Sequence, residues 1–342
     1  MITVIDAGPL STVQDLGRQS YGNLGLPRAG AADGMSLRVA NRLVGNADEA
    51  AALEMTVRGA ALRFETGTAV ALAGARTEAT LDGEPVPMYQ SLLVRAGATL
   101  RIGRITEGWR TYLAVAGGIG VPPVLGSRSS DTLSGLGPAP LVAGNRLPVA
   151  PFNLAEGFYL RSPPRFPQEV RLRVLPGPHD EWFTENALQT LVGTSCRVSA
   201  QSDRSGLRLE GMALPRARQE ELSSAGMTVG AIQVTGGGLP IVLLPNHGST
   251  GGYPVIATVI SADIPMLGQL GPGNSIRFTL VTRDAALKAL RERERRLQQD
   301  IVGADAGLLA ARALMMLAGR HPSLKQAVMD DGKRRLRIRR GD

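Results

Sequence analysis

Short apolar or alternating stretches recur along the chain, and turn-forming residues such as Gly, Pro and Asn separate them. Alternation with a period of two is typical of half-buried strands, and brief apolar runs between turns are typical of buried ones. The pattern therefore predicts a mainly β fold with minor α. The predicted strands include Ile2–Asp6, Ala69–Ala73, Ser91–Val94, Thr99–Gly103, Thr111–Ala116, Val170–Leu175, Ala231–Thr235, Ile241–Leu244 and Ser275–Val281.

Helical periodicity is rarer and is confined to a few segments. Asp33 is the expected N-cap of a helix over Gly34–Val44, and Gly45 is expected to end it. A short carboxylate accepts hydrogen bonds from the free N–H groups at a helix start, and glycine readily adopts the left-handed conformation at a helix end. The other predicted helices are His179–Leu191, Asp284–Gln299 and Ala304–Ala318.

Length and proline placement predict two domains. A chain of 342 residues can build two hydrophobic cores of ordinary size. A proline-rich stretch near the middle predicts a connection between them. A leucine stripe in the predicted helix Asp284–Gln299 indicates a packing or partner-facing surface. The expected organisation is an N-terminal β domain (1–150), a linker (151–168), a second β domain (169–283) and a helical extension with a basic tail (284–342).

The net charge of +8 does not indicate a nucleic-acid surface, because most of it lies in a short tail. Residues 333–342 hold six basic residues and one acidic residue, so the rest of the chain carries only +3. A solvated, disordered end is expected there. With one cysteine and no apolar stretch long enough to span a bilayer, the chain is expected to be cytoplasmic and not to bind a membrane.

Lysine is almost absent, which excludes several kinds of catalytic site. The chain has three lysines, Lys288, Lys325 and Lys333, against 35 arginines. The main body therefore has no P-loop lysine, no Schiff-base lysine and no Ser-Ser-Lys amidase triad. A metal site is not expected either, since Cys196 has no second cysteine to pair with as a ligand.

Two Gly-rich blocks, residues 8–33 and 246–263, are the most informative features of the chain. Both mix glycines with polar and charged groups, so they are expected to line a site rather than fill a core. In the first block, paired acids and arginines could hold a carboxylate or phosphate, with arginine as a bidentate donor. A structured loop whose charges pair with one another is the equally weighted alternative. The charged residues concerned are Asp15, Arg18, Arg28 and Asp33.

The second block follows a predicted strand and could form a backbone-lined pocket for an oxyanion or amide. Its polar residues are Asn246, His247, Ser249 and Thr250. His247 is a candidate general acid or base, although a lone histidine is more often structural. Two shorter Gly–Arg segments, around Arg128 and around Asp203–Arg204, could grip an anion or could equally be surface turns.

Ten ordered segments resemble the allophanate hydrolase subunit 2 family. This family includes the C subunit of bacterial ATP-dependent 5-oxoprolinase, an antagonist of a sporulation kinase inhibitor, and the carboxyltransferase part of urea amidolyase. The chain departs from the usual motifs at Gly248, where members often have Gln, and at Ala32, where Met is usual. The matching segments are GPLSTVQDLGR, LPRAGAAD, ANRLVGN, LEMT, YLAVAGGI, VLGSRS, VLPGP, SDRSGLRL, GAIQV and TGGYPVIATVI.

The resemblance implies two cyclophilin-like, β-barrel-like domains and a hetero-oligomer with a subunit 1 homologue. It also implies ATP-dependent opening of the lactam 5-oxoproline to glutamate by the complex, with the chain inactive on its own. On this view Arg18, Arg28 and Arg204 would hold anionic groups, and Asp15 or His247 would handle protons. Asp33, Arg128, Asp203, Asn246, Ser249 and Thr250 would complete the substrate site.

Two alternatives remain open at this point. One is a biotin-dependent carboxyltransferase acting on a urea-like substrate; its biotin would be carried by another protein, because the chain has no Met-Lys-Met carrier site. The other is a regulatory protein without turnover that binds the subunit 1 homologue.

Overall fold

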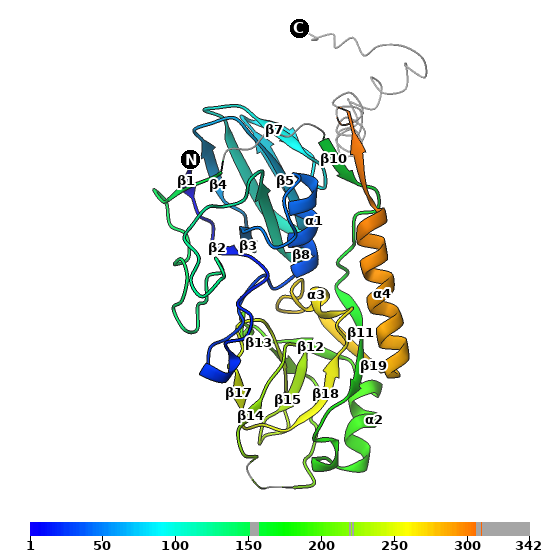
Figure 1. Ribbon diagram of the computed structural model, residues 1–342. Helices are drawn as coiled ribbons and strands as arrows, with labels where there is room; N and C mark the ends of the chain where they lie inside the picture. Colours follow the sequence, from blue (N-terminus) through cyan, green and yellow to red (C-terminus); the bar gives the residue numbers. More distant parts are fainter. Residues whose placement is uncertain (151–156, 219, 221, 306–308, 310–342) are drawn as a thin grey trace, which may run out of the picture.

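Apolar side chains are buried in two large clusters, each belonging to its own half of the chain. One cluster takes its residues from positions 2–160 together with Leu297, and the other takes them from positions 170–278. Burial of apolar surface is the main stabilising term in folding, so each cluster is a separate core. Figure 1 shows the first half of the chain above the second. The structure, a computed structural model, describes residues 1–150, 157–218, 220, 222–305 and 309.

The first core is built on a nine-stranded sheet within the described residues. Its main path runs in the order β2-β3-β8-β4-β1-β9, and β5 joins at β8 and carries β6 and β7. Helix α1 (Gly34–Leu43) packs on this sheet through buried Leu37 and Leu43. The strands are β1 (Ile2–Asp6), β2 (Leu10–Gln14), β3 (Ala52–Thr56), β4 (Ala61–Phe64), β5 (Thr68–Leu81), β6 (Glu84–Val86), β7 (Leu92–Val94), β8 (Thr99–Val115) and β9 (Arg146–Leu147).

The second core fills a closed barrel in the order β11-β18-β15-β16-β13-β12-β19. Strands β11 and β19 pair in parallel, which closes the sheet on itself and removes its edges. The mainly β prediction with a barrel-like second domain is confirmed. The strands are β11 (Glu169–Pro176), β12 (Cys196–Val198), β13 (Gly206–Glu210), β15 (Ala231–Val234), β16 (Pro240–Leu243), β18 (Val255–Val259) and β19 (Ser275–Leu280).

The remaining elements connect or flank these two sheets. Two small antiparallel pairs form, β10 with β20 and β14 with β17. Their bounds are β10 (Gly157–Leu160), β14 (Ala225–Gly226), β17 (Thr250–Gly251) and β20 (Ile301–Ala304). The other helical elements are η1 (Gly22–Leu24), η2 (Asp180–Trp182), α2 (Glu185–Gly193), α3 (Ile264–Leu267) and α4 (Arg283–Gln299).

Both Gly-rich blocks contain a buried strand, so the expectation that they fill no core is wrong in part. Strand β2 belongs to the first block and β18 to the second, and each is almost wholly buried. The polar side chains of β2 are satisfied internally; for example, the Ser11 hydroxyl donates to the Ala7 carbonyl at 2.5 Å. The glycines and charged residues of each block lie before or after its strand. The strands show no alternation of apolar and polar residues, because both faces of each strand are covered.

The strand predictions locate the sheets but divide one strand in two. The predicted strands Thr99–Gly103 and Thr111–Ala116 are parts of the single strand β8. Their polar middle, residues 104–110, pairs with β5 across several register shifts, and this disturbs the alternation that predicts a strand.

The helix predictions are confirmed for α1 and α4, but His179–Leu191 is interrupted. Phe183 and Thr184 adopt extended angles between η2 and α2, and the Phe183 side chain is buried. Of the predicted helix Ala304–Ala318, Ala304 belongs to strand β20, and most of the rest lies outside the described residues. The basic tail and positions 151–156 of the predicted linker lie outside them as well.

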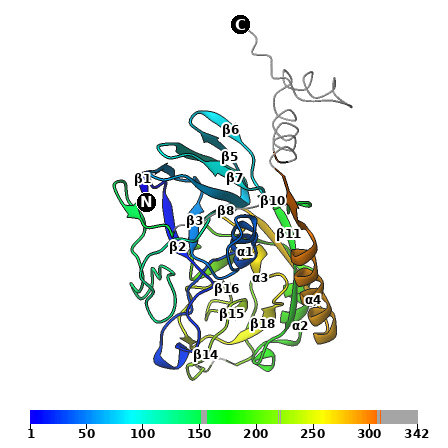
Figure 2. The same ribbon diagram turned by 45° about the horizontal axis from the view of Figure 1, so that its top comes forward.

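Helix α4 leads the chain back from the barrel to the first domain, as the two views in Figures 1 and 2 agree. It follows β19, and Leu297 near its end packs into the first core. After it, β20 pairs with β10, which lies inside the segment predicted as a linker. Arg38 of α1 holds Glu294 of α4 in a bidentate ion pair, with contacts of 3.0 and 2.8 Å.

Candidate functional site between the two domains

The two Gly-rich blocks meet at the junction of the domains. The Ala29 N–H of the first block donates to the Pro245 carbonyl, directly before the second block, at 3.1 Å. The first block is folded back on itself, and glycine is required for this. A Cβ atom on Gly17 would lie 2.6 Å from the Arg28 carbonyl oxygen, and both Gly17 and Gly30 have positive φ angles.

A cavity of about 760 Å³ lies where the blocks meet. The first block contributes residues 18–28 in part, and the second contributes His247, Ser249 and Thr250. Apolar side chains of Leu26, Pro27, Met227 and Val229 form part of the wall. The structure therefore places five of the predicted site residues around one cavity: Arg18, Arg28, His247, Ser249 and Thr250.

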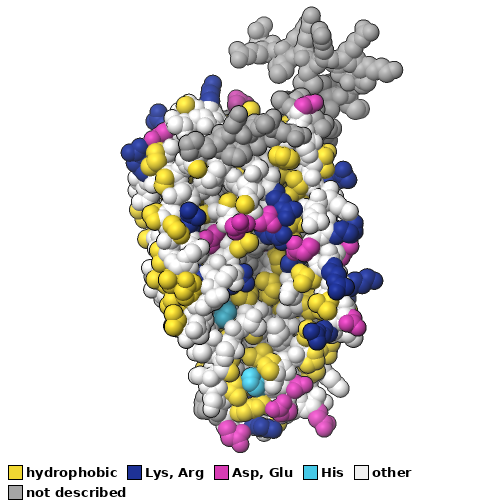
Figure 3. Space-filling view, in the orientation of Figure 1, with side chains coloured by type: hydrophobic (Ala, Val, Ile, Leu, Met, Phe, Trp, Pro, Cys, Tyr) yellow, Lys and Arg dark blue, Asp and Glu magenta, His cyan; other side chains and the backbone are white. Residues whose placement is uncertain are grey.

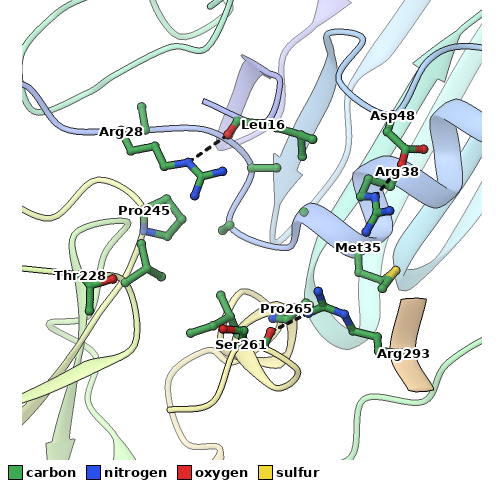
Figure 4. A pocket seen from close by; sticks show the side chains of 16 residues that line it. Leu16, Arg28, Met35, Arg38, Asp48, Thr228, Pro245, Ser261, Pro265 and Arg293 are labelled. Carbon is green, nitrogen blue, oxygen red and sulfur yellow. Dashed lines mark hydrogen bonds and ion pairs between the residues drawn. The ribbon is translucent and has the colours of Figure 1, made fainter. Parts of the chain in front are cut away.

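A second cavity of about 480 Å³ lies beside the first and shares Arg28 with it. Figure 4 shows the Arg28 guanidinium reaching across one side, with Arg38 and Arg293 on the other. Arg38 is paired with Asp48 at 2.8 Å, and Arg293 donates to the Ser261 carbonyl at 2.6 Å. Charged side chains gather around a hollow between the two domains in Figure 3.

Arg18 lies at the wall of the larger cavity and is only 2% exposed. Its Nη2 donates to the Ser129 carbonyl at 2.6 Å. Its Nε and Nη1 atoms are buried and have no hydrogen-bond partner in the described part of the chain. Two donors of a charged group are therefore available to a bound molecule.

Asp15 lines neither of the two cavities and is held mainly by residues 127–129, so its proton-handling role stays a prediction. Its carboxylate accepts from the Gly17 N–H at 2.7 Å, the Ser127 and Ser129 hydroxyls at 2.7 and 2.6 Å, and the Arg128 N–H at 2.6 Å. Four donors occupy its acceptor sites. This carboxylate joins the first block to residues 127–129. It thereby positions Ser129, whose carbonyl accepts from Arg18.

The most buried ion-pair cluster centres on Glu54, which the sequence-based site residues did not include. Its carboxylate forms ion pairs with Arg204 and, at 3.5 Å, with Arg110. It also accepts from the Ala32 N–H at 2.8 Å and from the Tyr112 hydroxyl at 2.7 Å. Burial lowers the pKa of Arg204 to about 10. The only sequence signal was the LEMT segment in which Glu54 lies.

Arg204 links the domains and lines neither of the two cavities. It reaches from the second half of the chain to Glu54, and its Nη2 donates to the Gly30 carbonyl at 2.6 Å and to the Asn246 side-chain oxygen at 3.2 Å. Asn246, fully buried, donates in turn to the Asp131 carboxylate at 3.2 Å. Arg204 and Asn246 therefore hold the two blocks in place, and Arg204 shares Glu54 with Arg110 as its counter-ion.

His247 lines the larger cavity and is held in one tautomer. Its Nδ1 lies 2.6 Å from the Gly248 carbonyl, which can only accept, so Nδ1 carries the proton. Burial lowers the pKa of His247, which keeps the ring neutral near pH 7. In that state Nε2 is the nitrogen that can accept a proton.

Asp33 caps helix α1 as expected, but it is enclosed at the domain junction. Its carboxylate accepts from the Ser36 N–H at 2.9 Å and from the Gln269 amide of the barrel domain at 2.7 Å. Burial raises the pKa of Asp33. Gly268, next to Gln269, approaches so closely that a Cβ atom there would lie 2.4 Å from the Ala32 backbone.

Two predicted residues lie away from both cavities. Asp203 is exposed, and its carboxylate accepts from the Ser205 N–H at 2.7 Å, which shapes a turn. Arg128 is half-buried, and its Nε donates to the Val121 carbonyl at 2.8 Å. Both side chains make structural contacts, and their anion-binding roles stay predictions.

No group of metal-binding side chains occurs among the described residues. None of the described helices is both long and apolar enough to cross a membrane.

Comparison with known proteins finds relatives of two kinds, 5-oxoprolinase C subunits and urea amidolyases. Residues 24–280 match the family model for the carboxyltransferase domain, subdomain A and B. The chain is 39% identical to the C subunit of 5-oxoprolinase from Escherichia coli, over 87% of this chain and 97% of that protein. It is 32% identical to the urea amidolyase of Saccharomyces cerevisiae, over 83% of this chain.

The crystal structure of the Kluyveromyces lactis urea amidolyase has a TM-score of 0.81 and 29% identity, over 86% of this chain. The chain spans only 17% of the yeast sequence and 20% of that crystallised chain. A further crystal structure shares 40% sequence identity with this chain. The present chain spans about half, 55%, of the chain in that crystal.

Proposed function

Since the chain belongs to the carboxyltransferase domain family, subdomains A and B, we propose that it is the C subunit of a 5-oxoprolinase complex. The family resemblance noted in the sequence is confirmed, and the name of the Escherichia coli relative indicates a multi-subunit enzyme. The finer statement is our proposal: with a subunit 1 homologue and ATP, the complex opens 5-oxoproline to glutamate.

The observation that carries this proposal is the cavity of about 760 Å³ in which both Gly-rich blocks take part. It combines arginine donors, one histidine and an apolar wall. A five-membered lactam with a carboxylate needs these three surroundings: a cation for the carboxylate, a group that moves a proton, and an apolar surface for the ring.

We infer that His247 handles the proton, because it lines the cavity with a neutral ring. Hydrolysis of the lactam adds hydroxide to the carbonyl carbon, breaks its bond to the ring nitrogen and gives that nitrogen a proton. His247 Nε2 can take the proton from the attacking water and return it to the leaving nitrogen. Arginine and main-chain N–H groups would stabilise the negative charge on the carbonyl oxygen.

In the complex, ATP would supply the driving force for opening this stable ring. Its γ-phosphoryl group would pass to the amide oxygen with release of ADP, and phosphate would leave after water has added and the ring has opened. The described residues that fit the phosphates of ATP are arginines, since the body of the chain has no lysine before Lys288. Arg28, exposed and shared by the two cavities, is the best placed of them.

The test is an assay of the purified chain together with its subunit 1 homologue. We expect ATP hydrolysis that depends on 5-oxoproline, with formation of glutamate. A complex that forms but hydrolyses no ATP with 5-oxoproline present would refute the proposal.

A biotin-dependent carboxyltransferase is the second candidate, and the similarity to urea amidolyases favours it. The same complex supplied with carboxybiotin and urea would then carboxylate urea. A tight complex with neither activity would indicate a regulatory protein.

A further inference from the structure

Arg18 carries a buried charge that forms no ion pair with a carboxylate of the described residues. Three arginines are buried among the described residues: Arg18, Arg110 and Arg204. Arg110 and Arg204 share Glu54 as their counter-ion. No ion pair of Arg18 occurs in the described part of the chain, and its one side-chain acceptor is the neutral Ser129 carbonyl.

The carboxylate nearest to it in sequence, Asp15, forms no ion pair with Arg18 among the described residues. Asp15 accepts one hydrogen bond from Gly17 and three from residues 127–129, and none comes from Arg18. A buried charge is unfavourable unless an opposite charge or hydrogen-bond acceptors accompany it. Arg18 Nε and Nη1 also lack any acceptor. A mobile anion would satisfy both the charge and the two donors.

The position of Arg18 admits such an anion. Its side chain lines the larger cavity together with Arg28 and His247. Because Ser129 fixes Nη2, the guanidinium is held before a ligand arrives, and little ordering entropy remains to be lost on binding.

We propose that Arg18 anchors an oxyanion in the larger cavity, through charge-assisted hydrogen bonds from Nε and Nη1. The ligand group is a carboxylate or a phosphate. This choice of ligands rests on the proposed function, in which the carboxylate belongs to 5-oxoproline and the phosphate to ATP. Arg204 is not an anion-binding group in this scheme.

Direct binding tests this proposal without turnover. Calorimetric titrations of the full chain, alone and with its subunit 1 homologue, would use 5-oxoproline, inorganic phosphate and pyrrolidin-2-one. The last compound is the same lactam without the carboxylate. Binding of 5-oxoproline but not phosphate assigns the site to a carboxylate, whereas binding of phosphate assigns it to a phosphate. We expect pyrrolidin-2-one to bind at least about 10-fold more weakly than 5-oxoproline in the first case.

Substitution separates ligand binding from a structural role. We expect Arg18→Gln to weaken anion binding about 10- to 100-fold, and Arg18→Lys, which keeps the charge but loses donors, to weaken it less. Arg146→Gln, at an exposed arginine paired with Glu65, is the matched control and should bind like the wild type. Without ligand, Arg18→Gln should melt at the wild-type temperature or above it, because it removes an uncompensated charge.

The proposal is overturned if neither anion binds in an Arg18-dependent manner, alone or in the complex. It is overturned equally if Arg18→Gln lowers the melting temperature of the unliganded chain, since the guanidinium would then be structural. Anion binding without 5-oxoproline turnover would refute the proposed function and leave this site intact. Turnover that is unaffected by Arg18→Gln would do the reverse.

Discussion

The buried arginines among the described residues differ in whether a carboxylate pairs with them. Glu54 serves two buried arginines and also accepts from the Ala32 N–H and the Tyr112 hydroxyl. A buried ion pair adds little net stability compared with apolar residues, but removing one partner leaves the other charge alone. Arg204 is therefore a cross-link between the domains.

Loss of the Glu54 charge should be severely destabilising. We expect Glu54→Gln to lower the free energy of unfolding by about 3–5 kcal/mol, because Arg110 and Arg204 would share no carboxylate. Urea unfolding followed by circular dichroism measures this. Glu65→Gln removes an exposed ion pair with Arg146 and should leave the midpoint nearly unchanged. Equal midpoints for both variants would contradict the structural role of Glu54.

His247 should make stability depend on pH in a defined direction. Burial lowers its pKa in the folded state below the reference value of 6.5, so the unfolded chain binds the proton more readily. The contribution of the neutral His247 ring to the free energy of unfolding is therefore complete above the pKa of the unfolded chain. It is lost as pH falls from about 6.5 towards the lower pKa of the folded state.

Urea unfolding at several pH values between 8 and 5 would detect this. The wild type should lose more stability on acidification than His247→Gln. His179→Gln, at a histidine that lines neither described cavity, serves as the reference. Parallel pH curves for the wild type and His247→Gln would show that the proton preference of His247 is unperturbed.

At the scale of the elements, the sequence predicted a helix or strand reliably where contacts within that element produce the pattern. Asp33 caps α1 through the Ser36 N–H, three residues along the chain. Strands β2 and β18 were missed because both of their faces are covered, and polar side chains in β2 find partners that lie far away in sequence. Gln14, for example, donates to the Ser130 carbonyl at 3.0 Å.

The α1 cap also carries an interdomain contact, and this predicts the effect of replacing it. Asp33→Ala should destabilise the protein by about 1–2 kcal/mol or more, since both the cap and the acceptor for Gln269 are lost. Asp33→Asn should cost less, because it keeps an acceptor oxygen and burial already raises the pKa of Asp33.

Thermal unfolding compares these two variants, with Thr282→Ala at the exposed cap of α4 as the reference. Asp33→Ala should exceed Thr282→Ala in its effect. If Asp33→Asn proves as damaging as Asp33→Ala, the charge of Asp33 matters more than its hydrogen bonds.

At the scale of the molecule, the cavities exist only because the domains are held together. Helix α4 starts at the barrel and ends against the first core, and Glu294 fastens it to Arg38 of α1. The smaller cavity is lined by Arg38 and Arg293, so α4 takes part in its wall.

We expect Glu294→Gln to loosen this attachment. Amide hydrogen exchange should become faster in α4 (Arg283–Gln299), whereas the barrel strands keep their protection. Glu292→Gln is the matched control, because Glu292 pairs only with Arg295 and Arg296 of its own helix among the described residues. Similar exchange in both variants would show that the contact with Arg38 does not hold the helix.

The sequence by itself determined the β-rich class, the strongest strands, two of the helices, and the glycine blocks that meet at the domain junction. These features depend on local periodicity, on caps and on glycines whose backbone angles other residues rarely adopt. Only the tertiary structure decided which charge has which partner. Arg18 and Arg204 look alike in sequence, yet Arg204 forms an ion pair with Glu54, whereas Arg18 lies beside a cavity with two donors unused within the described residues. The reason is physical: the state of a buried charge depends on neighbours brought together by folding, and a linear pattern does not contain them.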